Sequence, residues 1–277
     1  MENNGQFTPT RTCEILRELG HNPSKKLGQN FLVDSNIVRK SLELAEVSEG
    51  DYVVEVGPGL GTLTGALLER GAKVFAVELD KKLFAHLRSY FAGNANLNLV
   101  NADAVDFPLA ALPAEVRNFK IVANLPYAIS TPWLDAVLSG KLPSKMSLML
   151  QKEAALRFSA KNSSGEYSPI SIFLSEAYDV GQPHKVSAAC FFTRPGVDSM
   201  LLPLSIKEEP HVYCPAAKSL IRKIFSFRRK QLGSIAKSEG SGDISEWIDA
   251  AGIDSRLRPE AVAVPQWRLL DKILSQR

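Results

Sequence analysis

The chain has 277 residues, a formal net charge of +3, a pI near 8.7 and a hydrophobic content of 45%. This length and apolar content suffice for one large domain and a smaller one. No apolar run of about 18 residues predicts a membrane span, and the polar segment 1–9 lacks the apolar core of a signal peptide. We therefore expect a cytoplasmic protein with a loose N-terminal tail and no membrane partner.

The cysteines and histidines lack the spacing of a metal site. Cys13, Cys190 and Cys214 lie far apart in the chain and form no CxxC pair, and the four histidines are scattered. Separated thiols are the usual pattern in proteins of a reducing compartment. We therefore expect no zinc site, no disulfide framework and no metal cofactor.

Near the N-terminus, residues 11–23 predict one short helix that ends near Gly20 and Pro23. The following segment, 25–32, carries two lysines, a glycine and two amides, and precedes a helix that Asp34 or Ser35 can cap. One interpretation of this segment is a solvated linker. The other is a lid whose amides close over a small ligand.

The run 51–56, which is apolar from Tyr52 to Val56 except for Glu55, predicts a central parallel strand that is covered on both faces. It ends in the glycine-rich turn 57–61, and a helix is expected from about Thr62 to Arg70. A strand, a glycine-rich turn and a helix open many nucleotide-binding α/β units. The GxGxG spacing differs from the dinucleotide fingerprint, and the nearby acid Glu55 favours a ligand with a cationic end.

Three further short apolar runs predict strands: 73–77, 97–100 and 120–123. The four strand ends are marked by Gly57, Glu78, Asp103 and Asn124, which are 21, 25 and 21 positions apart. Because parallel strands bring their carboxyl ends to one edge of a sheet, these residues are expected to form one ligand site. Glu78 is placed to accept hydrogen bonds from a ribose diol, and Asp103 from an adenine amine.

The turn Asn124-Leu125-Pro126-Tyr127 follows the fourth strand. Proline fixes its own φ and favours extended geometry before it, so we expect the turn's carbonyls to stay available as acceptors. The asparagine oxygen is a further acceptor, and the tyrosine ring is a stacking surface. Alone, these residues are an ordinary Asn-Pro loop. Beside the other strand ends, they favour a site for a planar base with an exocyclic amine.

A fifth strand is expected over 146–150, and two late strands over 177–186 and 199–206. Between the late strands lies the segment 191–198, which begins with two phenylalanines and continues with an arginine and a proline. This segment can form a corner of the core. It can equally form the far wall of a base pocket.

After a polar linker at 207–215 the chain is expected to be helical, with further helices near 243–251 and 259–275. The run from Lys218 to Lys230 carries six cations and no acid, and its helical spacing sets them beside an apolar face. A charge run is usually a solvated face, but phosphate contact is the alternative. We expect three parts: an extension (1–23), a catalytic domain (24–207) and a helical domain (208–277).

In combination, these motifs resemble the rRNA adenine N6,N6-dimethyltransferase family, and within it the small-subunit enzymes. The similarity runs from about residue 24 to the C-terminus. The matching pieces are 28–32, 54–59, 78–80, 103–104, 124–127, 150–153, 192–195 with 197–199, and 227–230.

The resemblance implies a doubly wound, Rossmann-like α/β domain dependent on S-adenosylmethionine (SAM), with a small all-α C-terminal domain. It implies dimethylation of two adjacent adenines in the 3′-terminal hairpin of 16S rRNA, in the 30S subunit, and a role in subunit biogenesis. We expect a monomer without a metal. By matched position, the implied SAM contacts are Asn30, Leu32, Gly57, Glu78, Asp103 and Asn124. The implied catalytic, adenine-contacting residues are Asn124, Leu125, Pro126, Tyr127 and Phe192. The expected RNA contacts are Arg222, Lys223, Arg228, Arg229 and Lys230.

Three features depart from the family pattern: a long N-terminal extension, Ala128 after the tyrosine, and the continuation 231–235 after the basic run. The first rival is the large-subunit (23S) dimethyltransferase of the macrolide-resistance type, against which Leu125 and the segment 192–195 speak. The second is a non-catalytic assembly or transcription factor, which should lack Glu78, Asp103 or Asn124. The third is a small-molecule methyltransferase, which would not need the basic run.

Overall fold

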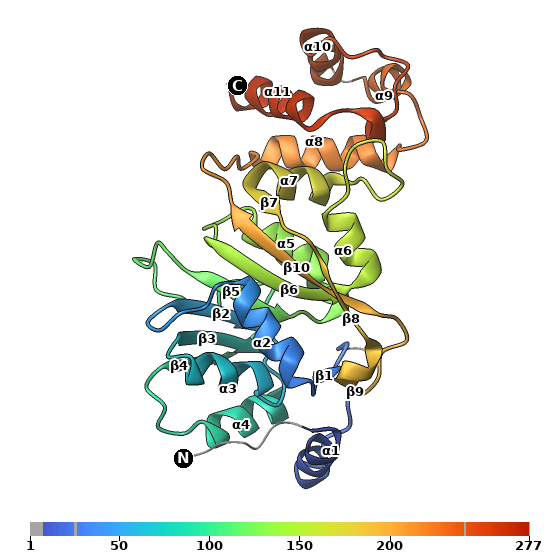
Figure 1. Cartoon of the computed structure of the whole chain (residues 1–277). Coiled ribbons are helices and arrows are strands. Elements are labelled where there is room, and N and C mark those ends of the chain that lie inside the picture. Colours follow the sequence, from blue (N-terminus) through green and yellow to red (C-terminus); the bar gives the residue numbers. More distant parts are fainter. Residues whose placement is uncertain (1–7, 25–26, 241, 277) are drawn as a thin grey trace. The chain divides into compact units, whose positions relative to one another are not determined.

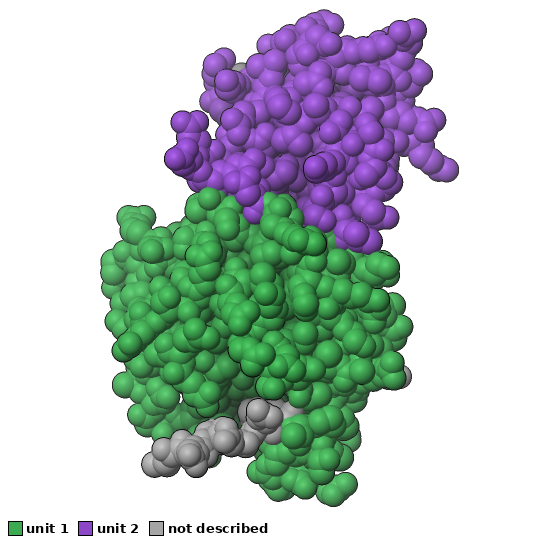
Figure 2. Space-filling model, viewed as in Figure 1, with its two compact units in different colours: residues 1–155, 180–206 green, residues 156–179, 207–277 purple. Residues whose placement is uncertain are grey.

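The structure, a computed structural model, describes residues 8–24, 27–240 and 242–276. Two lysines of the predicted lid, Lys25 and Lys26, and most of the predicted N-terminal tail lie outside these residues. The chain divides into two compact units, shown in separate colours in Figure 2: Met1–Ala155 with Val180–Ile206, and Leu156–Asp179 with Lys207–Arg277. Within the described residues, no helix is long and apolar enough to cross a membrane.

The first unit is built on one twisted sheet (Figure 1). Its strands follow the order β4 (Leu97–Asn101), β3 (Lys73–Glu78), β2 (Tyr52–Val56), β5 (Lys120–Asn124), β6 (Lys145–Gln151) and β10 (Ser199–Ile206). The first five strands pair in parallel, whereas β10 pairs antiparallel with β6 and with β8 (His184–Val186). The predicted parallel arrangement of the early strands is therefore confirmed.

The central strand β2 is buried on both faces, as its unbroken apolar run predicts. Val53 packs in a core cluster with α2 (Ser35–Leu44) and α3 (Thr62–Glu69), whereas Val54 and Val56 alternate to the other face and are also buried. Further helices of this unit are α4 (Lys81–Tyr90), α5 (Ser130–Val137) and the start of α6 (Lys152–Phe158), with 3₁₀ turns at Tyr127–Ile129 and Ala188–Cys190.

Two features of this unit differ from the sequence prediction. The single strand expected over 177–186 is instead β7 (Tyr178–Val180) and β8, because Gly181 and Pro183 interrupt the run. A second, two-stranded sheet joins β1 (Phe31–Leu32) to β9 (Phe191–Phe192) in antiparallel register. This pairing attaches the predicted lid to the late aromatic segment.

The N-terminal extension forms a helix, α1 (Pro9–Glu18), which is shorter than the predicted 11–23. The Thr8 hydroxyl caps it by accepting a hydrogen bond from the Arg11 amide at 3.2 Å, and Pro9 occupies the first helical position. Ile15 and Leu16 pack in one cluster with Phe31, Leu60 and Leu83. The described part of the extension is therefore docked on the first unit.

The second unit is helical. Its helices are α7 (Pro169–Ala177), α8 (Pro215–Ser226), α9 (Leu232–Glu239), α10 (Gly242–Ala250) and α11 (Val264–Ser275), with a 3₁₀ turn at Pro259–Ala261. The buried rings of Trp247 and Trp267 stack with their centroids 4.6 Å apart. Unlike the predicted domain 24–207, the structure groups 156–179 with this unit, because α7 packs against α8 and α11. The helical spacing of the run from Lys218 to Lys230 is not continued to its end, because α8 ends at Ser226.

Candidate functional site

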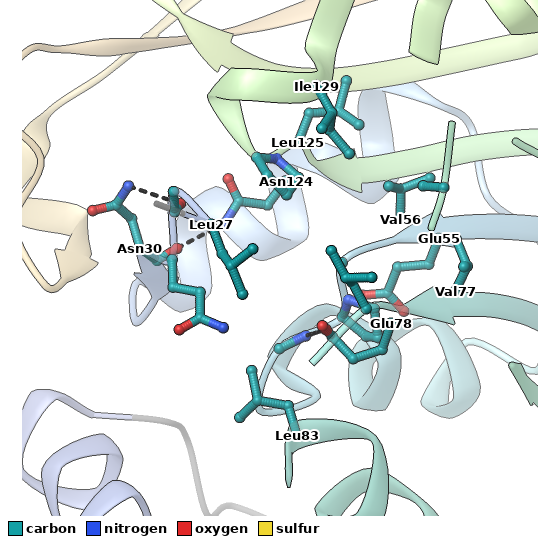
Figure 3. Close-up of a pocket in the computed structure, with 18 of the residues that line it drawn as sticks. Leu27, Asn30, Glu55, Val56, Val77, Glu78, Leu83, Asn124, Leu125 and Ile129 are labelled. Atoms are coloured by element: carbon teal, nitrogen blue, oxygen red, sulfur yellow. Dashed lines mark hydrogen bonds between the residues drawn. The ribbon is translucent and has the colours of Figure 1, made fainter. Parts of the chain in front are cut away.

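A cavity enclosing about 1090 Å³, part of it open to solvent, lies at the carboxyl ends of the parallel strands (Figure 3). Open α/β sheets commonly bind small molecules at this edge. It is lined by 27–32, 55–60, 62–63, 77–79, Leu83, 102–104 and 124–129. The strand ends that the sequence placed at one edge therefore do meet there.

Nine of the predicted site residues line this cavity: Asn30, Leu32, Gly57, Glu78, Asp103, Asn124, Leu125, Pro126 and Tyr127. Phe192 is not among the described lining residues. Its antiparallel pairing with Phe31 places it against the cluster that holds Ile15 and Leu16 of α1. The opposed pair of rings, Tyr127 and Phe192, that the sequence suggested therefore stays a prediction.

The glycine-rich turn is shaped by close approach. Gly57 and Gly59 have φ values of +65° and +62°, which residues other than glycine rarely adopt. A Cβ on Gly57 would lie 3.4 Å from the Pro126 ring, and one on Gly59 would lie 3.2 Å from the Phe31 ring. The positive φ therefore favours glycine at both positions, and at Gly59 a Cβ would also crowd the Phe31 ring.

Glu78 is held by two backbone donors at the edge of the cavity. Its Oε2 accepts a hydrogen bond from the Gly59 amide at 3.1 Å, and its Oε1 accepts one from the Asp80 amide at 2.8 Å. The residue is only 6% exposed, and burial raises the pKa of its carboxyl to about 7. The two amides fix the carboxyl's orientation, and each oxygen keeps a second lone pair for a ligand hydroxyl.

Asp103 lies at the next strand end, beside the same cavity. Its Oδ1 accepts a hydrogen bond from the Val105 amide at 2.8 Å. This bond orients the carboxyl group within its turn. The second oxygen of the group can therefore be presented to a ligand in a defined direction.

Glu55 corrects a sequence interpretation. We expected it to present a charge to the ligand, but its Oε2 accepts a hydrogen bond from the buried Thr64 hydroxyl at 2.7 Å. The residue is 1% exposed, and burial raises the pKa of its carboxyl to about 8. At pH 7 the carboxyl is therefore mostly neutral and does not favour a cationic ligand.

The raised pKa of Glu55 predicts a pH-dependent stability. Folding favours the protonated carboxyl, so this contribution is complete below about pH 4.5 and is lost as pH rises through 8, by at most about 1.4 kcal/mol per pH unit. Glu78 acts with the same sign up to about pH 7. Glu55→Gln keeps an acceptor for Thr64 but cannot titrate. Urea unfolding between pH 5 and 8.5 should therefore give a shallower decline than in the parent.

Glu69→Gln is the matched control, because Glu69 is exposed on α3. Its pH profile should overlay that of the parent. An unchanged slope in Glu55→Gln would contradict the assignment of the titrating group.

The Asn124 turn is tied to the lid. The Asn124 side-chain Nδ2 donates to the Asn30 backbone carbonyl at 3.0 Å, and the Asn30 side-chain Nδ2 donates to the Gly28 backbone carbonyl at 3.1 Å (dashed lines in Figure 3). The Asn124 side-chain oxygen takes no part in this bond and can act as an acceptor. We expected the carbonyls of this turn to stay available as acceptors, and for Pro126 this was wrong. A 3₁₀ turn begins directly after it, and its carbonyl accepts a hydrogen bond from the Ile129 backbone amide at 3.1 Å.

Tyr127 is half-buried and fixed at its hydroxyl. The hydroxyl forms a hydrogen bond with that of Ser199 on β10 at 2.9 Å. Burial raises the pKa of the Tyr127 hydroxyl, so the group is neutral at physiological pH. The ring is thus a fixed, uncharged surface at the rim of the cavity.

Several lining residues were not singled out from the sequence. They include Leu79 and Ile129, whereas Leu27, Gly28 and Gln29 belong to the segment 25–32 that the sequence predicted as a possible lid. Gly28 has a φ of +63°, and a Cβ there would lie 3.3 Å from the Tyr127 amide nitrogen, so the lid touches the turn closely. A glycine between apolar and amide residues was the available signal for this approach.

The cations of the run from Lys218 to Lys230 belong to the second unit, and the structure shows that several of them are buried or paired. Lys218 is 4% exposed and lies over the Phe173 ring. Lys223 forms an ion pair with Glu239. Arg228 lies 3.6 Å from a Glu260 oxygen and donates to the Ser164 carbonyl at 3.2 Å. Acids distant in sequence therefore pair with Lys223 and Arg228.

The remaining members of the set are exposed. Arg222 is on α8, with its guanidinium 5.5 Å from the centre of the Phe173 ring. Arg229 and Lys230 follow the end of the helix, and the Lys230 ammonium lies 4.9 Å from the Phe227 ring centre. Among the described residues, no group of three or more His, Cys, Asp or Glu side chains is arranged to hold a metal ion.

Two solved structures resemble this fold. A dimethyladenosine transferase from Plasmodium falciparum has a TM-score of 0.71 and 23% identity, over 89% of this chain and 98% of that one. The 23S rRNA methyltransferase ErmE has a TM-score of 0.60 and 25% identity, over 89% and 100% of the two chains. The fold and its cavity therefore define a Rossmann-like methyltransferase, as the sequence predicted.

Residues 20–276 match the family described as "Ribosomal RNA adenine dimethylase". The chain belongs to this family, which confirms the resemblance drawn from its motifs. It is 56% identical, over 95% of its length and 98% of the relative, to "Ribosomal RNA small subunit methyltransferase A" of Opitutus terrae. The protein of the same name from Moorella thermoacetica is 38% identical, over 96% and 98% of the two chains.

Proposed function

We propose that the chain acts as a monomer that transfers methyl groups from SAM to the N6 atoms of two adjacent adenines in the 3′-terminal hairpin of 16S rRNA, within the 30S subunit, during subunit biogenesis. The observation that carries the proposal is the cavity in which the Asn124–Tyr127 turn faces the strand ends of Gly57, Glu78 and Asp103. The name shared by the relatives supports small-subunit rRNA as the substrate.

The residues of the cavity fit the methyl donor. Glu78 presents a fixed carboxyl that can accept both hydroxyl protons of a ribose, and Asp103 can accept a proton from an adenine amine. Gly57 and Gly59 leave room for a ligand against the backbone. When bound, SAM supplies a methyl group activated by its sulfonium. The protein's share of the catalysis is then mainly positioning.

The Asn124 turn would hold the target amine. The N6 lone pair of adenine is delocalised into the ring and is a poor nucleophile. Hydrogen bonds from N6–H to the Asn124 oxygen and the Leu125 carbonyl would draw the nitrogen toward sp³ geometry. The Tyr127 ring, fixed through Ser199, would hold the flipped-out base by stacking worth about 1–3 kcal/mol. The proton can leave to water after transfer, and Ala128 leaves room for the monomethylated amine.

One assay tests the proposed function. The protein is incubated with labelled SAM and undermethylated 30S particles, free 16S rRNA or 50S particles, and the label is mapped. We expect label on two adjacent adenines of the 3′-terminal hairpin in 30S particles. Label in 50S particles would favour the large-subunit activity named for ErmE, and no label in any RNA would contradict the proposal.

Five cations of the second unit are proposed to contact rRNA phosphates: Arg222, Lys223, Arg228, Arg229 and Lys230. Arg229 and Lys230 lie in the turn after α8. Replacing both with glutamine should weaken 30S binding and reduce the slope of log binding constant against log salt by about 1.5, because two phosphate contacts are lost. SAM affinity should not change.

The adjacent pair Arg39 and Lys40 on α2 provides a control with the same charge change. Neutralising that pair should leave the salt slope of the parent. If the Arg229 and Lys230 variant also gives a line parallel to that of the parent, this turn does not contact phosphate. The RNA surface would then have to be sought near Arg194 or near Lys25 and Lys26.

A further inference from the structure

The Gln29 side chain connects the lid to the N-terminal segment and to the loop after β3. It does not lie at a strand end. Its side-chain oxygen accepts hydrogen bonds from the Ser24 amide at 2.7 Å and from the His21 Nε2 at 3.0 Å. Its side-chain nitrogen donates to Asp80 Oδ2 at 3.2 Å. Donors on one side and a carboxylate on the other allow only one orientation of the amide.

Asp80 carries this connection to the carboxyl group that faces the ligand. Its Oδ1 caps α4 by accepting bonds from the Lys82 and Leu83 amides at 2.9 and 3.2 Å. Its own backbone amide donates to Glu78 Oε1 at 2.8 Å. Gln29 and Glu78, which line the cavity from two segments, are therefore both attached to Asp80.

The N-terminal segment completes the arrangement. His21 is only 8% exposed, and its Nε2 lies 3.9 Å from Asp80 Oδ2 as well as beside Gln29. The Lys82 ammonium donates to the Gly20 carbonyl at 2.8 Å. Together with the apolar contacts of α1, these bonds attach the segment 8–24 to both the lid and the start of α4.

We propose that His21, Gln29 and Asp80 form a latch that holds the lid, 27–32, closed against the loop after β3 and fixes Glu78 in its ligand-binding orientation. Gln29 and His21 are then positioning residues. The N-terminal extension is then part of the cofactor site, because it holds the lid in place. A lid that is already ordered loses less conformational entropy when the ligand binds. The identity of the ligand as SAM rests on the proposed function.

Reversing the central hydrogen bond tests the latch. Gln29→Glu keeps the acceptor for Ser24 and His21 but sets a carboxylate against Asp80. Asp80→Asn can keep the α4 cap but sets a donor against the Gln29 amide. In the double variant, the new amide at position 80 can donate to the new carboxylate at position 29, so the bond returns with its direction reversed. We expect each single variant to bind SAM at least about tenfold more weakly in calorimetry, and the double variant to bind within about threefold of the parent.

Two further readouts separate positioning from loss of fold. Turnover at saturating SAM should stay near that of the parent, since the defect lies in KM for SAM. Hydrogen exchange of the amides of 27–32 should be faster in both single variants and slow again in the double variant. Gln182→Glu, in an exposed loop, should match the parent in every readout.

Parent-like binding by both single variants would overturn the latch, as would a double variant as weak as the sum of the two. A parent protein that binds no SAM would instead contradict the proposed function. The exchange pattern of 27–32 would still decide on the latch in that case, because it needs no ligand.

Discussion

Replacing Asn124 with alanine is expected to slow single-turnover methyl transfer by at least about 100-fold, with 30S binding within about twofold of the parent. The reason is that the Asn124 oxygen is proposed to orient the reacting amine, whereas RNA affinity is assigned to cations of the other unit. The measurement pairs single-turnover transfer to undermethylated 30S particles with equilibrium binding to the same particles. Equal losses in both would show that Asn124 is a structural residue of the turn.

The alanine variant also loses the bond from the Asn124 amide to the Asn30 carbonyl, which holds the lid. Asn124→Asp separates the two roles, because it keeps an acceptor for the amine but cannot donate to Asn30. If the acceptor role dominates, the aspartate variant should transfer methyl groups faster than the alanine variant. Equal rates would assign the effect to the lid.

The strand-end residues could be predicted because their placement follows from local pattern and one topological rule. Short apolar runs about 21 to 25 positions apart, with helices between the first three, form parallel strands, and such strands bring their ends to one edge. Gly57, Glu78, Asp103 and Asn124 needed no further information. The break in the late strand was missed, although Gly181 and Pro183 stand within it.

The position of Phe192 could not be predicted in this way. It depends on a two-residue strand that pairs with Phe31, about 160 positions away, and such short strands have no detectable periodicity. The neutral state of Glu55 likewise depends on burial and on Thr64 from the following helix. In the basic run, Glu239 and Glu260 pair with cations through tertiary contacts that a local count of charges does not contain.

Replacing Glu78 with alanine is expected to weaken SAM binding by roughly 1–3 kcal/mol, or about 5- to 150-fold, because two ribose hydroxyls lose their acceptor in a partly closed site. The structure adds a second cost. The Gly59 and Asp80 amides, which now donate to the carboxyl at 3.1 and 2.8 Å, would lose their partner, and the glycine-rich turn would lose its tie to β3.

Glu78→Gln tests whether the carboxyl must accept on both oxygens. One side-chain atom of glutamine can still accept from a backbone amide, but the other becomes a donor that faces a second donor. We therefore expect glutamine to weaken SAM binding almost as much as alanine does, whereas the exposed Glu69→Gln should have no effect. Calorimetry on the three variants and the parent gives the answer. Unchanged affinity in Glu78→Ala would remove Glu78 from the site, and parent-like affinity in Glu78→Gln would show that one accepting oxygen is enough.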